Sequence, residues 1–111
     1  MMIRQYDIWL ADLSPRMGTE PGKTRPVVII QTDLLNPFHP STVICPVASR
    51  IRPAVKLLRV HLQKGQLDKP SAILVDQLRA IDNRRLKQRL GALTPRQIKQ
   101  LKQNLLVVLD L

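Results

Sequence analysis

Short apolar runs, separated by turns that contain proline or glycine, fill the chain as far as residue 92. Five of these runs read as β-strands, at residues 3–13, 26–31, 42–48, 55–62 and 71–81, and a shorter strand is expected at 88–92. Residues 27–30 are all β-branched, which favours burial on both faces of that strand. Pro46 falls inside the third run, where a proline suits a sheet edge or a bulge.

One helix is predicted after the strands. Thr94, Pro95 and Gln97 have the spacing of a capping box with proline at the first helical position. Apolar residues at 98, 101, 105 and 108 or 109 then make a stripe along one face, and residues 83–86 fit a single helical turn. The 111 residues fit one domain spanning 1–111. Five or six short strands followed by one terminal helix predict a mainly β (α+β) fold, a small and partly closed barrel.

The charge of the chain is strongly basic and unevenly distributed. Lys and Arg number 18 against 8 Asp and Glu, which gives a formal net charge of +10. Residues 56–111 hold twelve basic residues against four acidic ones, whereas residues 1–55 hold six against four. This excess favours a polyanionic partner, and nucleic acid, an anionic membrane surface and an acidic protein all qualify.

Several functional classes lack their sequence signatures. Cys45 is the only cysteine, so an internal disulfide is excluded, as is typical of a reducing compartment. Arg4, Asp7 and Asp12 interrupt the N-terminal apolar run, which therefore has the features of neither a signal peptide nor a membrane span, and a cytoplasmic protein is expected. Neither HxxH nor CxxC spacing occurs, and phosphate-loop and dinucleotide signatures are missing too. No metal and no cofactor is expected.

The loop at residues 16–25 is the most unusual stretch. Its two glycines allow the backbone to approach a ligand closely. Glu20 and Arg25 bracket Lys23 and Thr24 directly before a buried strand. Arg25 therefore begins on a loop and ends on a rigid edge, which suits contact with a phosphate group. The alternative is a surface loop with an incidental ion pair between Glu20 and Arg25.

Other polar residues are weaker candidates. Asp76 and Gln77 stand inside an otherwise apolar strand, where an acid is either paired, with Arg79 or Arg25, or poised for function. The hydroxyl of Ser49 either binds a phosphate or satisfies the local backbone. His39 and His61 are more simply surface residues than acid–base groups, and Cys45 is more simply a core residue. A cluster of four cations reads as a solvated surface or as a contact for a polyanion: Arg84, Arg85, Lys87 and Arg89.

The order of these motifs resembles a known family. The segments Tyr6-Asp7-Ile8-Trp9, Leu13-Ser14-Pro15, Gly18-Thr19-Glu20 and Arg25-Pro26-Val27-Val28-Ile29-Ile30 are similar to the opening signature of MazF/PemK toxins. The similarity continues at Pro46-Val47, at Val75-Asp76-Gln77 with Arg79, at Ile81-Asp82, and at Gly91 and Leu93 before the terminal helix. The G-x-E, R-P and D-Q elements are weak singly and specific in combination.

The resemblance implies a fold, an activity and partners. The fold is an SH3-like or CcdB-like β-barrel that forms a homodimer. The activity is that of an endoribonuclease toxin, which cleaves single-stranded RNA, including mRNA, at short sequence motifs without a metal. A cognate antitoxin would neutralise it by covering the RNA groove with an acidic C-terminal segment. By matching position, the resemblance implies catalytic roles for Arg25 and Glu20, and a role for Asp76 in RNA contact or catalysis.

Cleavage of this kind requires a base to remove the proton of a ribose 2′-OH and a cation to stabilise the phosphoryl oxygens. Arg25 suits the second role, while Glu20 is either the base or the group that orients Arg25. Ser49 is the third catalytic candidate. The expected RNA-binding residues are Lys23, Thr24, Arg50, Asp76, Gln77 and Arg79.

One departure from the family pattern leaves alternatives open. After the third strand the family usually has a Thr followed by Ser or Thr, whereas this chain has Ala48-Ser49. Ser49 could substitute, although its side chain would leave the strand on the opposite face. A catalytically weakened module that binds RNA or an antitoxin is therefore a second hypothesis. A CcdB-like toxin that acts on gyrase is a third, and the Glu20 and Arg25 signature argues against it.

Overall fold

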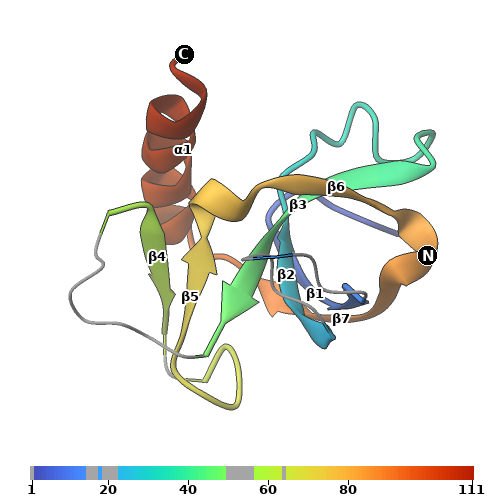
Figure 1. Ribbon diagram of the computed structural model, residues 1–111, viewed down its shortest axis with the longest axis horizontal. Helices are drawn as coiled ribbons and strands as arrows, with labels where there is room; N and C mark the ends of the chain where they lie inside the picture. Colours follow the sequence, from blue (N-terminus) through green and yellow to red (C-terminus); the bar gives the residue numbers. More distant parts are fainter. Residues whose placement is uncertain (1, 15–17, 19–22, 50–56, 64) are drawn as a thin grey trace.

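A computed structural model describes residues 2–14, 18, 23–49, 57–63 and 65–111, and it shows a strongly curved antiparallel sheet with one C-terminal helix (Figure 1). The predicted mainly β fold is confirmed. The elements are β1 (Asp7–Asp12), β2 (Thr24–Ile29), β3 (Ser41–Ala48), β4 (Arg59–Leu62), β5 (Ser71–Leu74), η1 (Val75–Gln77), β6 (Arg79–Asp82), η2 (Asn83–Arg85), β7 (Leu86–Ala92) and α1 (Pro95–Leu109).

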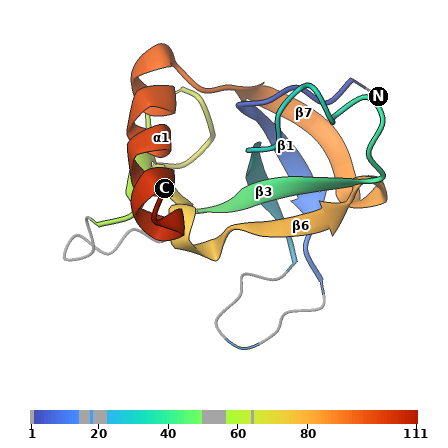
Figure 2. The same cartoon turned by 90° about the horizontal axis from the view of Figure 1, so that it is seen from above.

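The strands follow the order β4-β5-β3-β2-β1-β7, and β6 pairs with the other half of β3. Figure 2 shows these strands curling around a common interior, with α1 packed at one end. The long strand β3 is therefore central, and the proposal of an edge position for Pro46 is wrong. Pro46 instead lies where β3 changes partner from β6 to β5.

The strand predicted at residues 71–81 is divided in two. Ile73 pairs with Val47 and Arg79 pairs with Ile44, so five residues between these pairs on one side face two on the other. The extra residues are looped out as the 3₁₀ turn η1, which contains Asp76 and Gln77. The prediction that these two polar residues lie inside a strand is therefore wrong. A bulge of this kind bends a sheet, and here it helps to curl the barrel.

Two apolar clusters occupy the two faces of the sheet. Val27 belongs to one and Val28 to the other, so the predicted burial of this strand on both faces is confirmed. The helix covers the cluster that contains Val28, and Leu101 is its fully buried anchor. Thr94 caps the helix through a complete capping box with Gln97, as predicted. The strand predicted from residue 3 begins only at Asp7, because Tyr6 turns the chain with a φ of +69°.

Candidate active site

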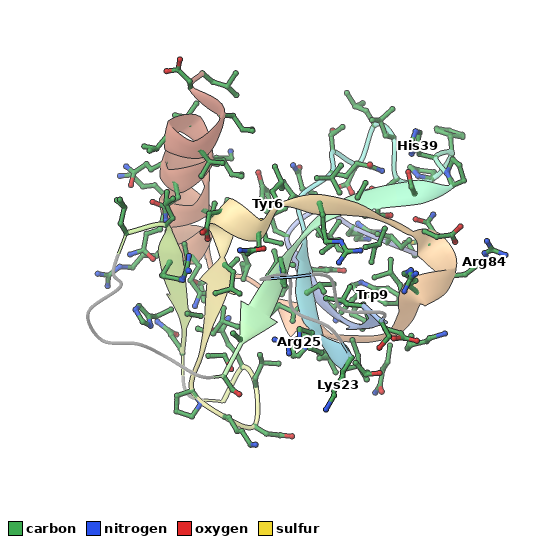
Figure 3. The ribbon with its side chains drawn as sticks, in the orientation of Figure 1. Tyr6, Trp9, Lys23, Arg25, His39 and Arg84 are labelled. Carbon is green, nitrogen blue, oxygen red and sulfur yellow. The ribbon has the colours of Figure 1, made fainter. Side chains whose placement is uncertain are left out.

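The residues that lead into β2 lie at one end of the barrel, where Figure 3 places Lys23 and Arg25. Arg25 pairs with Ala11 of β1, and Thr24 pairs with Asp12. The side chain of Arg25 shares its strand face with Val27 and is half-buried, whereas Lys23 and Thr24 are exposed. Arg25 therefore stands on a hydrogen-bonded strand, and the residue is partly open to solvent.

The loop between β1 and β2 is closed at its base by a set of short polar contacts. The backbone N–H of Leu13 donates to the carbonyl oxygen of Lys23 over 2.8 Å, and the N–H of Lys23 donates to Ser14 Oγ over 3.1 Å. Arg85 Nη1 donates to the carbonyl oxygens of Asp12, over 3.1 Å, and of Ser14. Lys23 adopts a φ of +63° to complete the turn into β2. These contacts fix the point at which the loop leaves the barrel.

Asp12 contributes to the same base through its carboxylate, which accepts a hydrogen bond from the N–H of Ser14 over 3.0 Å. That backbone bond, the Ser14 hydroxyl and the charges of Arg85 and Lys87 together lower the pKa of Asp12. From the sequence, Arg85 belongs only to a cationic cluster, and its contact with this loop was not predicted. No sequence pattern links residues more than seventy positions apart.

The end of β3 reaches the same level of the barrel. β2 and β3 pair through Val27 and Pro46, and Arg25 lies two residues before this pair while Ala48 lies two residues after it. Antiparallel register therefore brings Arg25 level with Ala48, and Thr24 level with Ser49. Ser49 is exposed at the bend after β3. Two predicted site residues, Glu20 and Arg50, lie outside the described residues.

Asp76 is exposed in η1 and forms an ion pair with Arg59, in which Nη1 and Oδ1 are 2.5 Å apart. The prediction that Asp76 forms an ion pair with Arg79 or Arg25 is therefore wrong, because the looped-out turn directs Asp76 toward β4. Gln77 and Arg79 are half-buried, and Arg79 pairs with Ile44 of β3.

The four cations of the predicted cluster each contact the protein itself. Arg84 contacts Asp82 with both Nε and Nη2 at 3.0 Å, and Arg89 Nε lies 3.0 Å from the buried carboxylate of Asp7. Lys87 Nζ donates to the carbonyl oxygen of Arg84 over 3.2 Å. With Arg85 at the loop base, the cluster braces η2 and β7 as well as carrying charge.

Cys45 and His39 are two of the remaining candidate residues. Cys45 is a buried free thiol whose pKa is raised to about 12, mainly by burial and further by the charge of Asp76, so the core interpretation is confirmed. His39 is exposed, and its Nδ1 lies 2.9 Å from the carbonyl oxygen of Ser41. Within the described ranges, no three His, Cys, Asp or Glu side chains are grouped to hold a metal ion. Nor does any helix in that part of the chain have the length and apolar character needed to cross a membrane.

Comparisons with known proteins agree with this geometry. Residues 4–109 match the profile of a family described as PemK-like, MazF-like toxin of type II toxin–antitoxin system. The chain is 42% identical over 101 residues to an endoribonuclease MazF of Staphylococcus saprophyticus. The matched region covers 89% of this chain and 84% of that protein.

Solved structures share the fold. MazF from Deinococcus radiodurans superposes with a TM-score of 0.88 at 21% identity, covering 100% of this chain and 99% of that one. A mycobacterial endoribonuclease, solved in complex with its cognate antitoxin, gives a TM-score of 0.81 at 16% identity, covering 98% and 96%. Fold and site thus define a small barrel with a basic edge at the start of β2. The chain belongs to the PemK-like, MazF-like toxin family.

Proposed function

We propose that this chain is an endoribonuclease toxin that cleaves single-stranded RNA, including mRNA, at short sequence motifs. The observation that carries the proposal is the position of Arg25, half-exposed at the start of β2 and level with the end of β3. Family membership and the 42% identical endoribonuclease MazF support the same activity. They favour it over the two alternatives, a weakened binding module and a toxin that acts on gyrase.

The reaction is transesterification within the RNA, which needs no metal. A base removes the proton of the ribose 2′-OH, and this oxygen forms a bond to the neighbouring phosphorus. The bond from phosphorus to the 5′-oxygen breaks, and that oxygen takes up a proton. The products are a 2′,3′-cyclic phosphate and a 5′-OH end. Arg25 supplies a permanent, forked cation to the phosphoryl oxygens as their charge grows, and Glu20 acts as the base or orients Arg25.

Hydroxyl groups near Arg25 complete the proposed site. Family members usually have a threonine at the position of Ala48, and this chain has none there. Ser49 and Thr24 are both exposed, and the register of β2 and β3, continued beyond Val27 and Pro46, sets them opposite each other, one residue from Ala48 and Arg25. We assign Ser49 the role of hydrogen-bond donor to the phosphate. Lys23, Thr24, Arg50, Asp76, Gln77 and Arg79 are the proposed contacts for the rest of the RNA.

The proposed partners follow from charge and exposed apolar surface. An antitoxin with an acidic C-terminal segment would cover the basic edge at the start of β2 and exclude RNA from it. A homodimer would cover apolar side chains near the end of α1, where Val107 is 64% exposed and Leu111 84% exposed. A cytoplasmic location is part of the same proposal, since the substrate is mRNA and the only cysteine is a free thiol.

The test is cleavage of a long, mixed-sequence RNA by purified protein in the presence of EDTA, with mapping of the cut ends. Arg25→Ala should lower kcat by about 100- to 1000-fold, and Arg25→Lys should restore only part of it, because an ammonium cannot make the forked contact. Arg4→Ala is the control for lost charge. No cleavage by wild-type protein freed of antitoxin, or full activity in Arg25→Ala, would overturn the proposal.

A further inference from the structure

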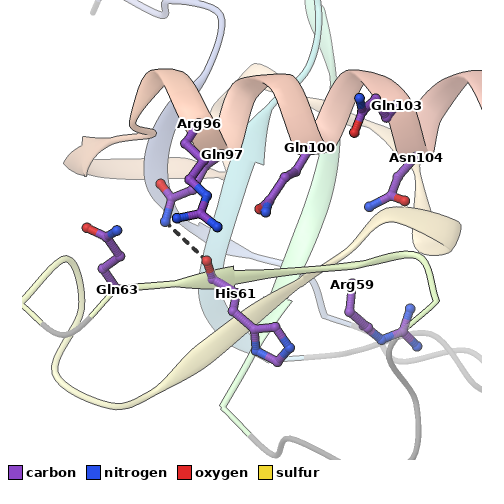
Figure 4. Close-up of a pocket in the computed structure, with 8 residues that line it drawn as sticks. All are labelled: Arg59, His61, Gln63, Arg96, Gln97, Gln100, Gln103 and Asn104. Atoms are coloured by element: carbon purple, nitrogen blue, oxygen red, sulfur yellow. Dashed lines mark hydrogen bonds between the residues drawn. The ribbon is translucent and has the colours of Figure 1, made fainter.

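A polar groove of about 360 Å³ lies between β4 and α1 (Figure 4). Among the residues that the structure describes, all the side chains that line it are polar, and none is a carboxylate. They are Arg59, His61 and Gln63 on the strand side, and Arg96, Gln97, Gln100, Gln103 and Asn104 on the helix side. A hollow of this size and composition suits a polar, negatively charged ligand.

The two walls of the groove match in length. Residues 59 and 61 are two apart in β4 and so share one face, and Gln63 directly follows the end of this strand. Residues 96, 100 and 103 or 104 are three and four apart and share one helix face. Eight residues of helix rise by about 12 Å, and four steps of strand cover about 13 Å. Figure 4 shows the helix running along the strand, so the groove is elongated and suits a chain-like ligand.

Most of the lining groups are available to a ligand. Gln97 and Arg59 are the exceptions. The Nε2 of Gln97 donates to the carbonyl oxygen of His61 over 3.1 Å and so fixes the helix against β4. Arg59 is held by Asp76. Within the described part of the chain, the side chains of His61, Arg96 and Gln100 make no hydrogen bond or ion pair.

The groove is linked to Arg25 by the register of the sheet. His61 pairs with Ala72, Ala72 pairs with Ala48, and Arg25 lies level with Ala48. Ala48, Ala72 and His61 thus form one row across β3, β5 and β4, and the register of β2 and β3, continued two residues beyond the Val27–Pro46 pair, extends the row to Arg25. Three strand spacings separate the ends of the row, a span of about 14 Å. An RNA strand that passes Arg25 along this row reaches His61 and the mouth of the groove within a few nucleotides.

We propose that the groove between β4 and α1 is a second binding site for the same RNA strand, outside the scissile phosphate. This inference rests on the proposed function. Arg59 and Arg96 would contact phosphate oxygens, and the His61 ring would stack on an unpaired base. The other four side-chain amides, Gln63, Gln100, Gln103 and Asn104, supply both donors and acceptors, which base edges use. An acidic peptide of Asp and Glu would offer no aromatic ring to stack on His61 and no base edges for the amides to read, so this lining favours RNA.

The test compares Arg96→Ala with Lys99→Ala, a matched loss of one charge on the same helix but outside the groove. Binding is measured by fluorescence anisotropy with 2′-O-methylated RNA, which cannot supply the attacking hydroxyl. We expect Arg96→Ala to lower the slope of log K against log salt by about 0.7, the value for one phosphate contact on a single strand. Lys99→Ala should leave the slope unchanged.

Length dependence provides the second readout. Wild-type protein should bind an RNA extended on both sides of the cleavage motif more tightly than an RNA that spans only the motif. Arg96→Ala and His61→Ala should each lower the ratio of these two affinities by about tenfold, or about 1.4 kcal/mol. Equal effects of Arg96→Ala and Lys99→Ala would mean a general charge effect and would overturn the proposal. Weaker binding of an oligoglutamate peptide with unchanged RNA binding would assign the groove to an acidic peptide instead.

The binding assay remains decisive if the proposed nuclease activity fails. In that case wild-type protein cleaves no RNA, yet the salt slope of mixed-sequence 2′-O-methylated RNA still reports on the groove. A slope that is the same for wild-type protein and Arg96→Ala would reject the groove, whatever the outcome of the cleavage assay.

Discussion

Arg85 donates hydrogen bonds from Nη1 to the carbonyl oxygen of Ser14, 71 residues earlier in the chain, and to that of Asp12. η2 thereby holds the base of the β1–β2 loop, whose other end continues into Thr24 and Arg25. The contact couples the second half of the chain to the residues proposed to cleave RNA.

Arg85→Ala should therefore lower kcat/KM for RNA cleavage by about 100-fold, since a displaced loop misaligns the reacting groups. Arg84→Ala is the control, because Arg84 is the neighbouring arginine and contacts Asp82 instead. Arg85→Lys should recover part of the rate through one of the two carbonyl contacts. Equal rates for wild type and Arg85→Ala, with both folded by circular dichroism, would rule out a positioning role.

Gln97 is a buried amide whose partners lie on three elements of the fold. Its Oε1 accepts from the N–H of Thr94 over 2.9 Å, and its Nε2 donates to Gln66 Oε1 over 2.7 Å and to the carbonyl oxygen of His61. Gln97→Ala should lower the free energy of unfolding by about 2–3 kcal/mol, because buried groups lose their partners. Gln100→Ala, on the exposed side of the same turn, should change it by less than about 0.5 kcal/mol. Urea denaturation followed by Trp9 fluorescence measures both.

The side-chain hydrogen bonds from Arg84, followed by the bond from its backbone N–H, lower the pKa of Asp82 to about 2. Because folding lowers the pKa of this carboxyl, its ionised form stabilises the native state at pH values above the ordinary pKa of 3.8. This contribution is lost as the pH falls through about 2. Arg84→Ala should raise the pKa of Asp82 toward 3.8, and the remaining backbone bond should keep it below that value. Titration of the carboxyl carbon by NMR checks this; an unchanged pKa would contradict it.

Burial raises the pKa of the Cys45 thiol to about 12 from an ordinary value of 9.0. At pH 8 the thiolate fraction is then lower by about 1000-fold, and the thiol should not react with a disulfide reagent in the folded protein. Reaction should become complete in denaturing urea. Rapid modification of the native protein at pH 8 would show that β3 opens readily at this position.

Four apolar side chains near the C-terminal end of α1 are exposed: Leu106, Val107, Leu109 and Leu111. If the proposed homodimer forms through them, Val107→Glu should convert it to a monomer, since a carboxylate would be buried without a partner. Leu34→Glu changes a residue that is 83% exposed on the loop after β2, and it should leave the dimer intact. Sedimentation equilibrium distinguishes these outcomes. A dimer that survives Val107→Glu but not Leu34→Glu would place the interface on the loop instead.

Local sequence patterns were sufficient for most of the elements. The capping residues and the apolar stripe of α1 act within one or two helical turns, so Thr94, Gln97 and Leu101 could be assigned without tertiary information. The β-branched run at residues 27–30 predicted a buried strand for the same reason. The looped-out turn at Val75–Gln77 could not be predicted, because it arises from a mismatch in length between β3 and the two strands that share it.

The sequence by itself determined the mainly β class, the terminal helix, the basic character and the family motifs around Arg25. Each of these depends on residue type or on spacing within a short segment. Tertiary structure alone decided that Asp76 pairs with Arg59, that Arg85 holds the base of the β1–β2 loop, and that His61 lies in one row with Ala72 and Ala48. Such contacts join distant parts of the chain, and their geometry is set by strand register and by the curl of the sheet, which no local pattern encodes.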